Sequence, residues 1–203
     1  MKVILALQKG IIGISLLLLA GIPAASSFFD MSFEVRGWLY IFSFVAVFLL
    51  MLVRPLADIF TEQLWVRRLV ILRKGFGIFS ASIIVGFMIA SIIAPQSVYL
   101  ASFFTAHFWS FGNYVAFAHI GDITGLILLI TSNTFSQRIL KLNWKRIQRL
   151  SYVYFYAGGI YEAFALNSTF ALYAILVVTN ITVLAWAVKL WRKSAATPVT
   201  IGV

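Results

Sequence analysis

Residues 37–53, GWLYIFSFVAVFLLMLV, decide the fold class of this chain. They carry no charged side chain and end at Arg54-Pro55. An apolar run of this length can cross the hydrocarbon core of a bilayer, about 30 Å thick, as a single helix. Runs of similar character recur along the chain and predict five further spans, at 10–29, 75–94, about 114–132, about 150–166 and 169–188.

The composition agrees with a membrane protein. Hydrophobic residues make up 62% of the 203 residues and charged residues 11%, and the mean hydropathy is +0.99. Soluble domains are about half apolar and about a quarter charged, so an ordinary cytosolic domain is excluded. We therefore predict an all-α integral membrane protein, with residues 1–203 forming one transmembrane domain of six helices. Run 10–29 also resembles a signal peptide ending near Ala24-Ala25-Ser26, but we interpret it as a retained span.

The basic residues predict the orientation of these spans. If the N-terminus is cytoplasmic, Arg36 alone among the 16 Lys and Arg residues falls outside. Basic residues collect on the cytoplasmic side of membrane proteins, so we expect both termini to be cytoplasmic. The same rule accounts for the net charge of +10 without a nucleic-acid partner. The absence of cysteine excludes disulfides, thiolate metal sites and iron–sulfur ligation.

Two cytoplasmic segments are predicted to be amphipathic helices. In residues 134–150, Thr134 and Gln137 fit a capping box. Pro55 suits the first turn of a second helix over residues 55–73. We leave two roles open for the first helix: contact with anionic lipid, or docking of an acidic partner. Its basic face would comprise Arg138, Lys141, Lys145 and Arg149.

The outer segment 95–113 is rich in aromatic residues and has no Lys, Arg, Asp or Glu. Such an apolar segment is poorly suited to open water. It could lie in the membrane interface, or it could contact another membrane subunit, a pigment or a quinone. The residues that we expect to make a partner contact are Phe103, Phe104, Phe108 and Trp109.

Asp122 is the residue of the fourth span that most needs an explanation. A carboxylate exposed to lipid there would cost roughly 2.5–3.5 kcal/mol, so its side chain should face the bundle interior. His119, three positions earlier, shares its helix face. The pair could form a proton or quinol site, bind a metal, or hold helices together as a polar contact. Gly121 and Gly125 on the same helix allow another helix to approach closely.

The order of several motifs resembles a known family. Gly37-Trp38 opens a span that ends at Arg54-Pro55, LLITSN occupies residues 128–133, and WKRIQRLSY occupies residues 144–152. Over about residues 37–165 the chain resembles the ferric-reductase-like transmembrane domain, most closely the MsrQ/YedZ type, a heme-binding membrane subunit in bacteria. The resemblance implies a six-helix bundle in the bacterial inner membrane, with heme b between the central helices.

The resemblance also implies three heme histidines, and their positions hold other residues. Gln148, Tyr161 and Phe87 occupy them. Of these, tyrosine alone belongs to the set that ligates heme iron, which is His, Met, Cys or Tyr. His107 and His119 are the chain's two histidines. A straight helix would separate them by about 18 Å, so sharing one iron would require a bend near Gly112-Asn113.

Two functions therefore stay open. The first is a heme-free accessory or structural subunit of a larger respiratory or photosynthetic membrane complex, without catalytic activity of its own. The second is a heme b electron-transfer protein with unusual ligands, for which His107, His119 and Tyr161 are the candidates. The missing histidines favour the first function, so we expect no cofactor and no metal, and we expect lipid and other membrane subunits as partners.

Overall fold

The computed structural model describes residues 2–29, 31–94, 99–112 and 114–196, and every regular element in them is helical. The long helices are α1 (Lys2–Phe28), α2 (Phe33–Ile59), α4 (Arg73–Ile93), α6 (Val115–Thr131), α9 (Leu150–Ile160) and α10 (Thr169–Ala196). Short elements connect them: α3 (Leu64–Leu69), η1 (Val70–Leu72), α5 (Tyr99–Ser102), η2 (Ala106–Trp109), α7 (Thr134–Leu140), α8 (Leu142–Ile147) and the π-helical turn η3 (Tyr161–Ala165). The all-α prediction is confirmed.

Four described helices are long and apolar enough to cross a membrane: Lys2–Phe28, Phe33–Ile59, Leu64–Ile93 and Thr169–Ser194. A fifth is α6 taken together with α7, a pair bent by 92°. The described residues thus support four or five spans, fewer than the six predicted. The difference lies in α9, because its 11 residues and the π-helical turn after it together form a short helix.

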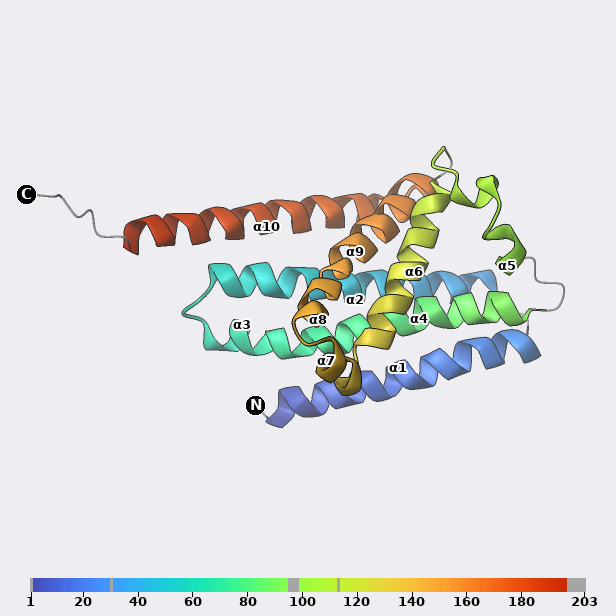
Figure 1. Ribbon diagram of the computed structural model, residues 1–203, viewed down its shortest axis with the longest axis horizontal. Coiled ribbons are helices and arrows are strands. Elements are labelled where there is room, and N and C mark those ends of the chain that lie inside the picture. Colours follow the sequence, from blue (N-terminus) through green and yellow to red (C-terminus); the bar gives the residue numbers. More distant parts are fainter. Residues whose placement is uncertain (1, 30, 95–98, 113, 197–203) are drawn as a thin grey trace, which may run out of the picture.

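Successive long helices run in alternating directions, so that the start of α1 and the end of α10 lie at the same end of the molecule (Figure 1). Helices α2 and α4 lie side by side in the middle. Helix α1 packs on α4, α10 packs on α2, and α6 lies against both α4 and α9. The main core cluster is formed by α2, α6, α9 and α10 and includes the stacked rings of Phe44 and Phe155, 5.7 Å apart.

A hydrogen-bonded group of three hydroxyls lies at the centre of this bundle. The Ser80 Oγ atom of α4 is 2.9 Å from Ser43 Oγ of α2 and 2.8 Å from the Tyr154 hydroxyl of α9. All three side chains are buried. Hydrogen bonds between buried hydroxyls can join helices inside a membrane, where apolar contact alone gives little preference over lipid. This group therefore connects the three central helices.

The segment predicted as one helix over residues 134–150 is broken. Lys141 has a φ of +46°, which separates α7 from α8. The cap also differs from the predicted capping box, because the Asn133 side chain accepts the Ser136 amide hydrogen at 2.7 Å. An asparagine directly before the first turn satisfies that amide, so Thr134 begins the helix and does not cap it.

Helix α2 continues through Pro55, so the prediction of a new helix beginning at this proline is wrong. Proline removes one backbone donor, and transmembrane helices tolerate that loss where neighbouring groups compensate. The true end of α2 is capped from elsewhere in the chain. The Arg192 guanidinium of α10 donates to the carbonyl oxygens of Asp58, at 3.0 Å, and Ile59, at 2.8 Å.

Candidate functional site

A polar cluster lies near the start of α6, beneath the segment formed by α5 and η2. His119 and Asp122 are one helical turn apart, and His119 Nδ1 is 3.6 Å from Asp122 Oδ2. The nitrogen is buried and lies just beyond hydrogen-bonding distance of the carboxylate. The Tyr99 hydroxyl donates to the same Oδ2 atom, at 3.4 Å. The structure thus adds a phenol from another segment to the pair predicted from spacing.

Glycines bring the helix that carries this pair close to its neighbour. A Cβ atom added at Gly121 would lie 3.8 Å from the backbone nitrogen of Gly158 in α9. One added at Gly125 would lie 3.1 Å from the Tyr154 ring. The predicted close approach of a second helix at Gly121 and Gly125 is confirmed, and that helix is α9.

The aromatic segment packs over His119. The Phe108 ring is stacked on the imidazole, with centroids 3.4 Å apart and planes 5° from parallel. The Trp109 indole donates to the Phe103 carbonyl oxygen at 2.9 Å and so holds the segment in a turn. Phe108 is only 6% exposed, whereas Phe104 is 89% exposed. We therefore restrict the partner-contact hypothesis to Phe104 and its exposed surroundings; residues 95–98 and 113 of this segment lie outside the described part.

Further ionisable groups surround the cluster. Tyr40 of α2 lies near Asp122, Tyr161, Glu162 and Arg36. Sequence reasoning missed Tyr40, Tyr99 and Glu162. The signal for Glu162 was present, since it is a carboxylate inside the predicted span 150–166, as Asp122 is inside the fourth span. Nothing local in the sequence indicated the two tyrosines.

Tyr99 lies in α5, outside the membrane-spanning helices, and its hydroxyl is affected by this arrangement. Burial raises the pKa of its hydroxyl above the usual range for tyrosine, and the charge and hydrogen bond of Asp122 raise it further. A neutral phenol that donates to a carboxylate is the form that this geometry favours. The cluster thus joins the phenol of one segment to the carboxyl of another, with the imidazole nitrogen 3.6 Å from the same oxygen. Among the described residues, no group of three or more His, Cys, Asp or Glu side chains is placed to hold a metal ion.

Two of the three family heme positions hold side chains that are engaged in contacts of their own. Phe87 is buried and stacked on Tyr40, with centroids 4.7 Å apart. Gln148 lies just before α9 and donates to Thr131 Oγ1 at 3.5 Å. Tyr161 begins η3. It lies about 20 Å from Gln148 along the helix, at about 1.5 Å per residue. Aromatic side chains pack between α2 and α9, where the Phe44 and Phe155 rings are stacked.

The two histidines lie in different elements of the fold. His107 belongs to η2 and is exposed, whereas His119 belongs to α6 and is covered by Phe108. Between them Tyr114 has a φ of +62°, so the two residues are not on one helix; Asn113 lies outside the described residues. The ring faces of His119 and Phe108 are in direct contact, so this imidazole is part of the aromatic packing around η2.

The predicted basic face is distributed over three elements. Arg138 lies on α7, Lys141 at the break, Lys145 on α8 and Arg149 at the start of α9. Exposed apolar side chains accompany them, with Phe135, Ile139 and Leu142 each more than 60% exposed. Short helices with exposed apolar and basic side chains are typical of segments that lie in a membrane interface.

Two of the motifs that support the family resemblance, LLITSN at 128–133 and WKRIQRLSY at 144–152, meet in the structure. The Trp144 indole of the second motif donates to the carbonyl oxygen of Thr131 in the first, at 3.0 Å. With the Gln148 contact, this bond fixes α8 against the end of α6. Comparison with models of known protein families, with curated proteins and with solved structures found no match to this chain.

Proposed function

We propose that this chain is a heme-free accessory subunit of a larger membrane complex, built on a ferric-reductase-like bundle of six spans. Packing between helices is the role that its features support best. Phe87 and Gln148 are engaged in contacts of their own where the family would ligate iron. The polar cluster around Asp122 contributes contacts between segments. The membrane is the bacterial inner membrane, with both termini on the cytoplasmic side.

The observation that carries this proposal is the position of Asn180. It lies near the middle of α10 and is exposed on the outer face of the bundle. Its amide nitrogen donates to the Leu176 carbonyl oxygen of its own helix, at 2.7 Å, and within the described ranges it makes no bond to another helix. A polar side chain in the middle of a span usually faces another helix, because lipid offers it no hydrogen-bond partner. The outer face of α10 is therefore a surface for a neighbouring subunit.

Replacing Asn180 with leucine should weaken association with that subunit. Hydrogen bonds between membrane helices contribute about 0.6–2 kcal/mol, so we expect roughly 3- to 30-fold less complex. Crosslinking in native membranes, followed by purification in mild detergent, measures this. Val183→Ala changes an apolar residue one turn away and is the matched control. A chain that is monomeric in its native membrane, or a complex unaffected by Asn180→Leu, contradicts the proposal.

The purified protein should show no Soret absorption band. The reason is that Gln148 and Phe87 offer no ligand for heme iron, and His107 and His119 lie in different elements, η2 and α6. A visible spectrum of protein extracted in mild detergent tests this directly. Stoichiometric heme would instead support the electron-transfer alternative, and His107→Ala and His119→Ala would then identify the ligand.

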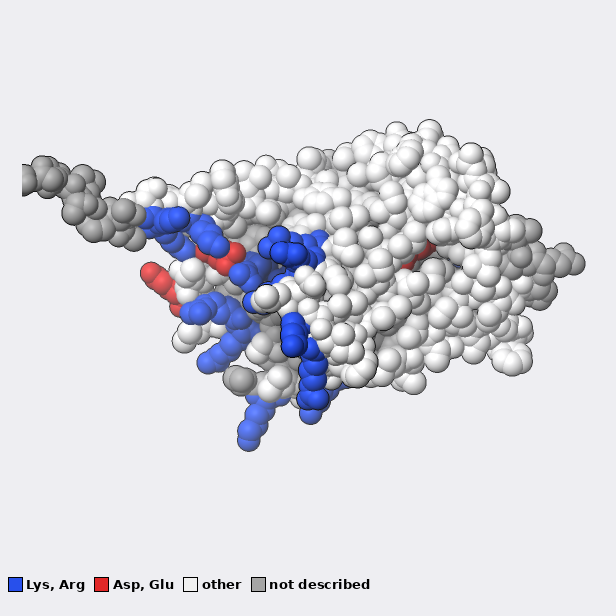
Figure 2. Space-filling view, viewed as in Figure 1, with Lys and Arg blue, Asp and Glu red and all other residues white. Residues whose placement is uncertain are grey.

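The six-span topology predicts that reporter fusions at residue 30, within 95–112 and at residue 167 lie outside. The alternating helix directions in Figure 1 support this prediction, as does the collection of Lys and Arg side chains at one end of the molecule in Figure 2. Helix α6 has 17 residues and rises about 26 Å, which is near the lower limit for a span. A cytoplasmic signal from residues 95–112 would exclude six spans.

A further inference from the structure

An apolar groove opens where α2 ends and α3 begins. Its volume is about 360 Å³. Val53, Leu56 and Phe60 line one wall at spacings of three and four residues, which places them on one face of the end of α2. Trp65, Val66 and Leu69 line the other wall from α3. The polar side chain in the lining, Gln63, accepts a hydrogen bond from the Trp65 indole at 3.1 Å.

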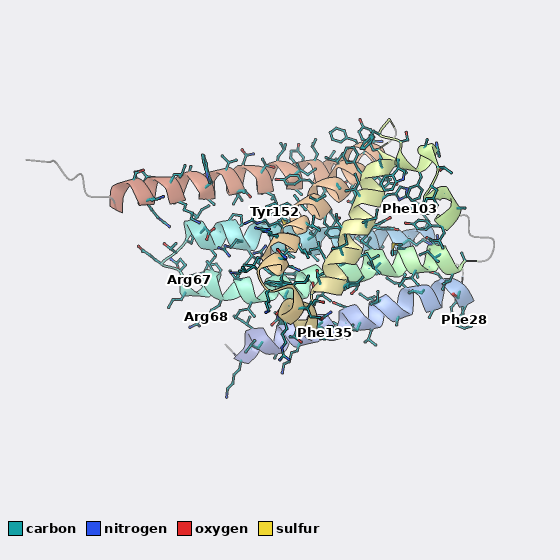
Figure 3. The ribbon with its side chains drawn as sticks, in the orientation of Figure 1. Phe28, Arg67, Arg68, Phe103, Phe135 and Tyr152 are labelled. Atoms are coloured by element: carbon teal, nitrogen blue, oxygen red, sulfur yellow. The ribbon has the colours of Figure 1, made fainter. Side chains whose placement is uncertain are left out.

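Basic side chains flank this groove. Arg67 and Arg68 lie on α3 between the lining residues Val66 and Leu69, and both are exposed. Figure 3 shows them at the end of the molecule opposite to Phe28 and Phe103. Lys and Arg side chains gather at the same end in Figure 2.

The acidic residues nearby do not cancel this charge. Asp58 is paired with Arg54, with 3.5 Å between Nε and Oδ1. Glu62, in the turn before α3, is one exposed carboxylate beside two exposed arginines. The rim of the groove is thus net positive. It lies at the end of α2 that follows Arg54, where the apolar run 37–53 has ended.

We propose that the groove binds an anionic phospholipid, with one acyl chain between α2 and α3 and the phosphate at Arg67 and Arg68. An apolar groove beside basic residues lies at the depth where lipid headgroups meet acyl chains. Guanidinium groups match phosphate oxygens in geometry and charge. Trp65 beside the groove suits the same depth, because indole rings favour the membrane interface. This site is independent of the packing role proposed for α10.

Lipid retention measured by native mass spectrometry tests the headgroup contact. Protein equilibrated with equal amounts of phosphatidylglycerol and phosphatidylcholine of the same chains should preferentially retain phosphatidylglycerol. Arg67→Gln with Arg68→Gln should lower that preference about fivefold for each arginine removed. Arg67→Lys with Arg68→Lys should keep most of it, and Lys2→Gln with Lys9→Gln, which removes the same charge from exposed positions on α1, is the matched control. Equal retention of both lipids, or equal loss in the control, overturns the proposal.

Fluorescence locates the acyl chain. Phosphatidylglycerol brominated along its acyl chains should quench the fluorescence of Trp65. The Trp65 signal is the fluorescence of the native chain minus that of Trp65→Phe. Leu69→Trp fills the groove and should abolish lipid retention, whereas Leu184→Trp adds the same ring to the exposed surface of α10 and should not. Retention unchanged by Leu69→Trp, or Trp65 unquenched while lipid is retained, overturns the placement of the chain in the groove.

Discussion

Replacing Ser80 with leucine should destabilise the bundle by roughly 2–6 kcal/mol. Ser80 is fully buried where α2, α4 and α9 meet. A larger side chain there forces the helices apart, which typically costs about 1–3 kcal/mol. The substitution also removes the two buried hydrogen bonds of Ser80, to the Tyr154 hydroxyl at 2.8 Å and to the Ser43 hydroxyl at 2.9 Å, and the loss of both costs about 1–3 kcal/mol.

Titration with a denaturing detergent measures this loss of stability. The folded fraction is read from the monomer peak in size-exclusion chromatography. Ala20→Leu is the matched control, since Ala20 is exposed on α1 and the same side chain there meets lipid. Ser80→Ala separates the two contributions, because it removes the hydrogen bonds without adding volume; we expect a loss of about 1 kcal/mol. A Ser80→Leu variant as stable as Ala20→Leu would show that the three hydroxyls do not hold the centre together.

Gly121→Leu should separate α6 from α9 and cost about 3 kcal/mol, at the upper end of the range for overpacking. The atoms opposite Gly121 are the backbone of Gly158, which cannot move aside as a side chain can. Alanine should be tolerated at this position, because its Cβ would lie 3.8 Å from the nearest atom, an ordinary contact distance. We therefore expect a sharp difference between Gly121→Ala and Gly121→Leu in the same unfolding measurement.

Gly13→Leu is the control for this second variant. Gly13 is on α1, and no atom lies within 4 Å of a Cβ built there. Helix propensity favours leucine over glycine at both positions, so a loss at Gly121 alone must come from packing. Equal stability of Gly121→Leu and Gly13→Leu would contradict the close approach of α6 and α9.

The parts of the fold that follow from transfer into lipid could be predicted from the sequence. The apolar run 37–53 lies within α2, and 169–188 lies within α10. The bounds of the helices could not be predicted in this way, because backbone hydrogen bonding continues beyond the apolar part. Helix α1 therefore begins at Lys2, and α2 passes through Pro55. The break at Lys141 depends on a positive φ that no residue pattern indicated.

In the candidate site, a contact between residues close in sequence could be predicted, whereas contacts between distant residues could not. His119 and Asp122 could be paired from sequence because a spacing of three places both on one helix face. Tyr99 reaches Asp122 from a separate segment, and Ser80 meets Tyr154 across 74 residues of chain. Contacts of that separation depend on how the helices are arranged, and hydropathy carries no information about it.

The bond from Arg192 to the end of α2 determines when this protein can finish folding. The carbonyl oxygens of Asp58 and Ile59 receive their donor from α10, which the ribosome makes after every helix that it contacts. Ala171, Ala174 and Val178 of α10 also complete the core around Phe44 and Phe155. A nascent chain inserted without α10 therefore exposes both an open core and an uncapped helix end. Membrane quality-control proteases that recognise such features could distinguish an unfinished chain from a complete one.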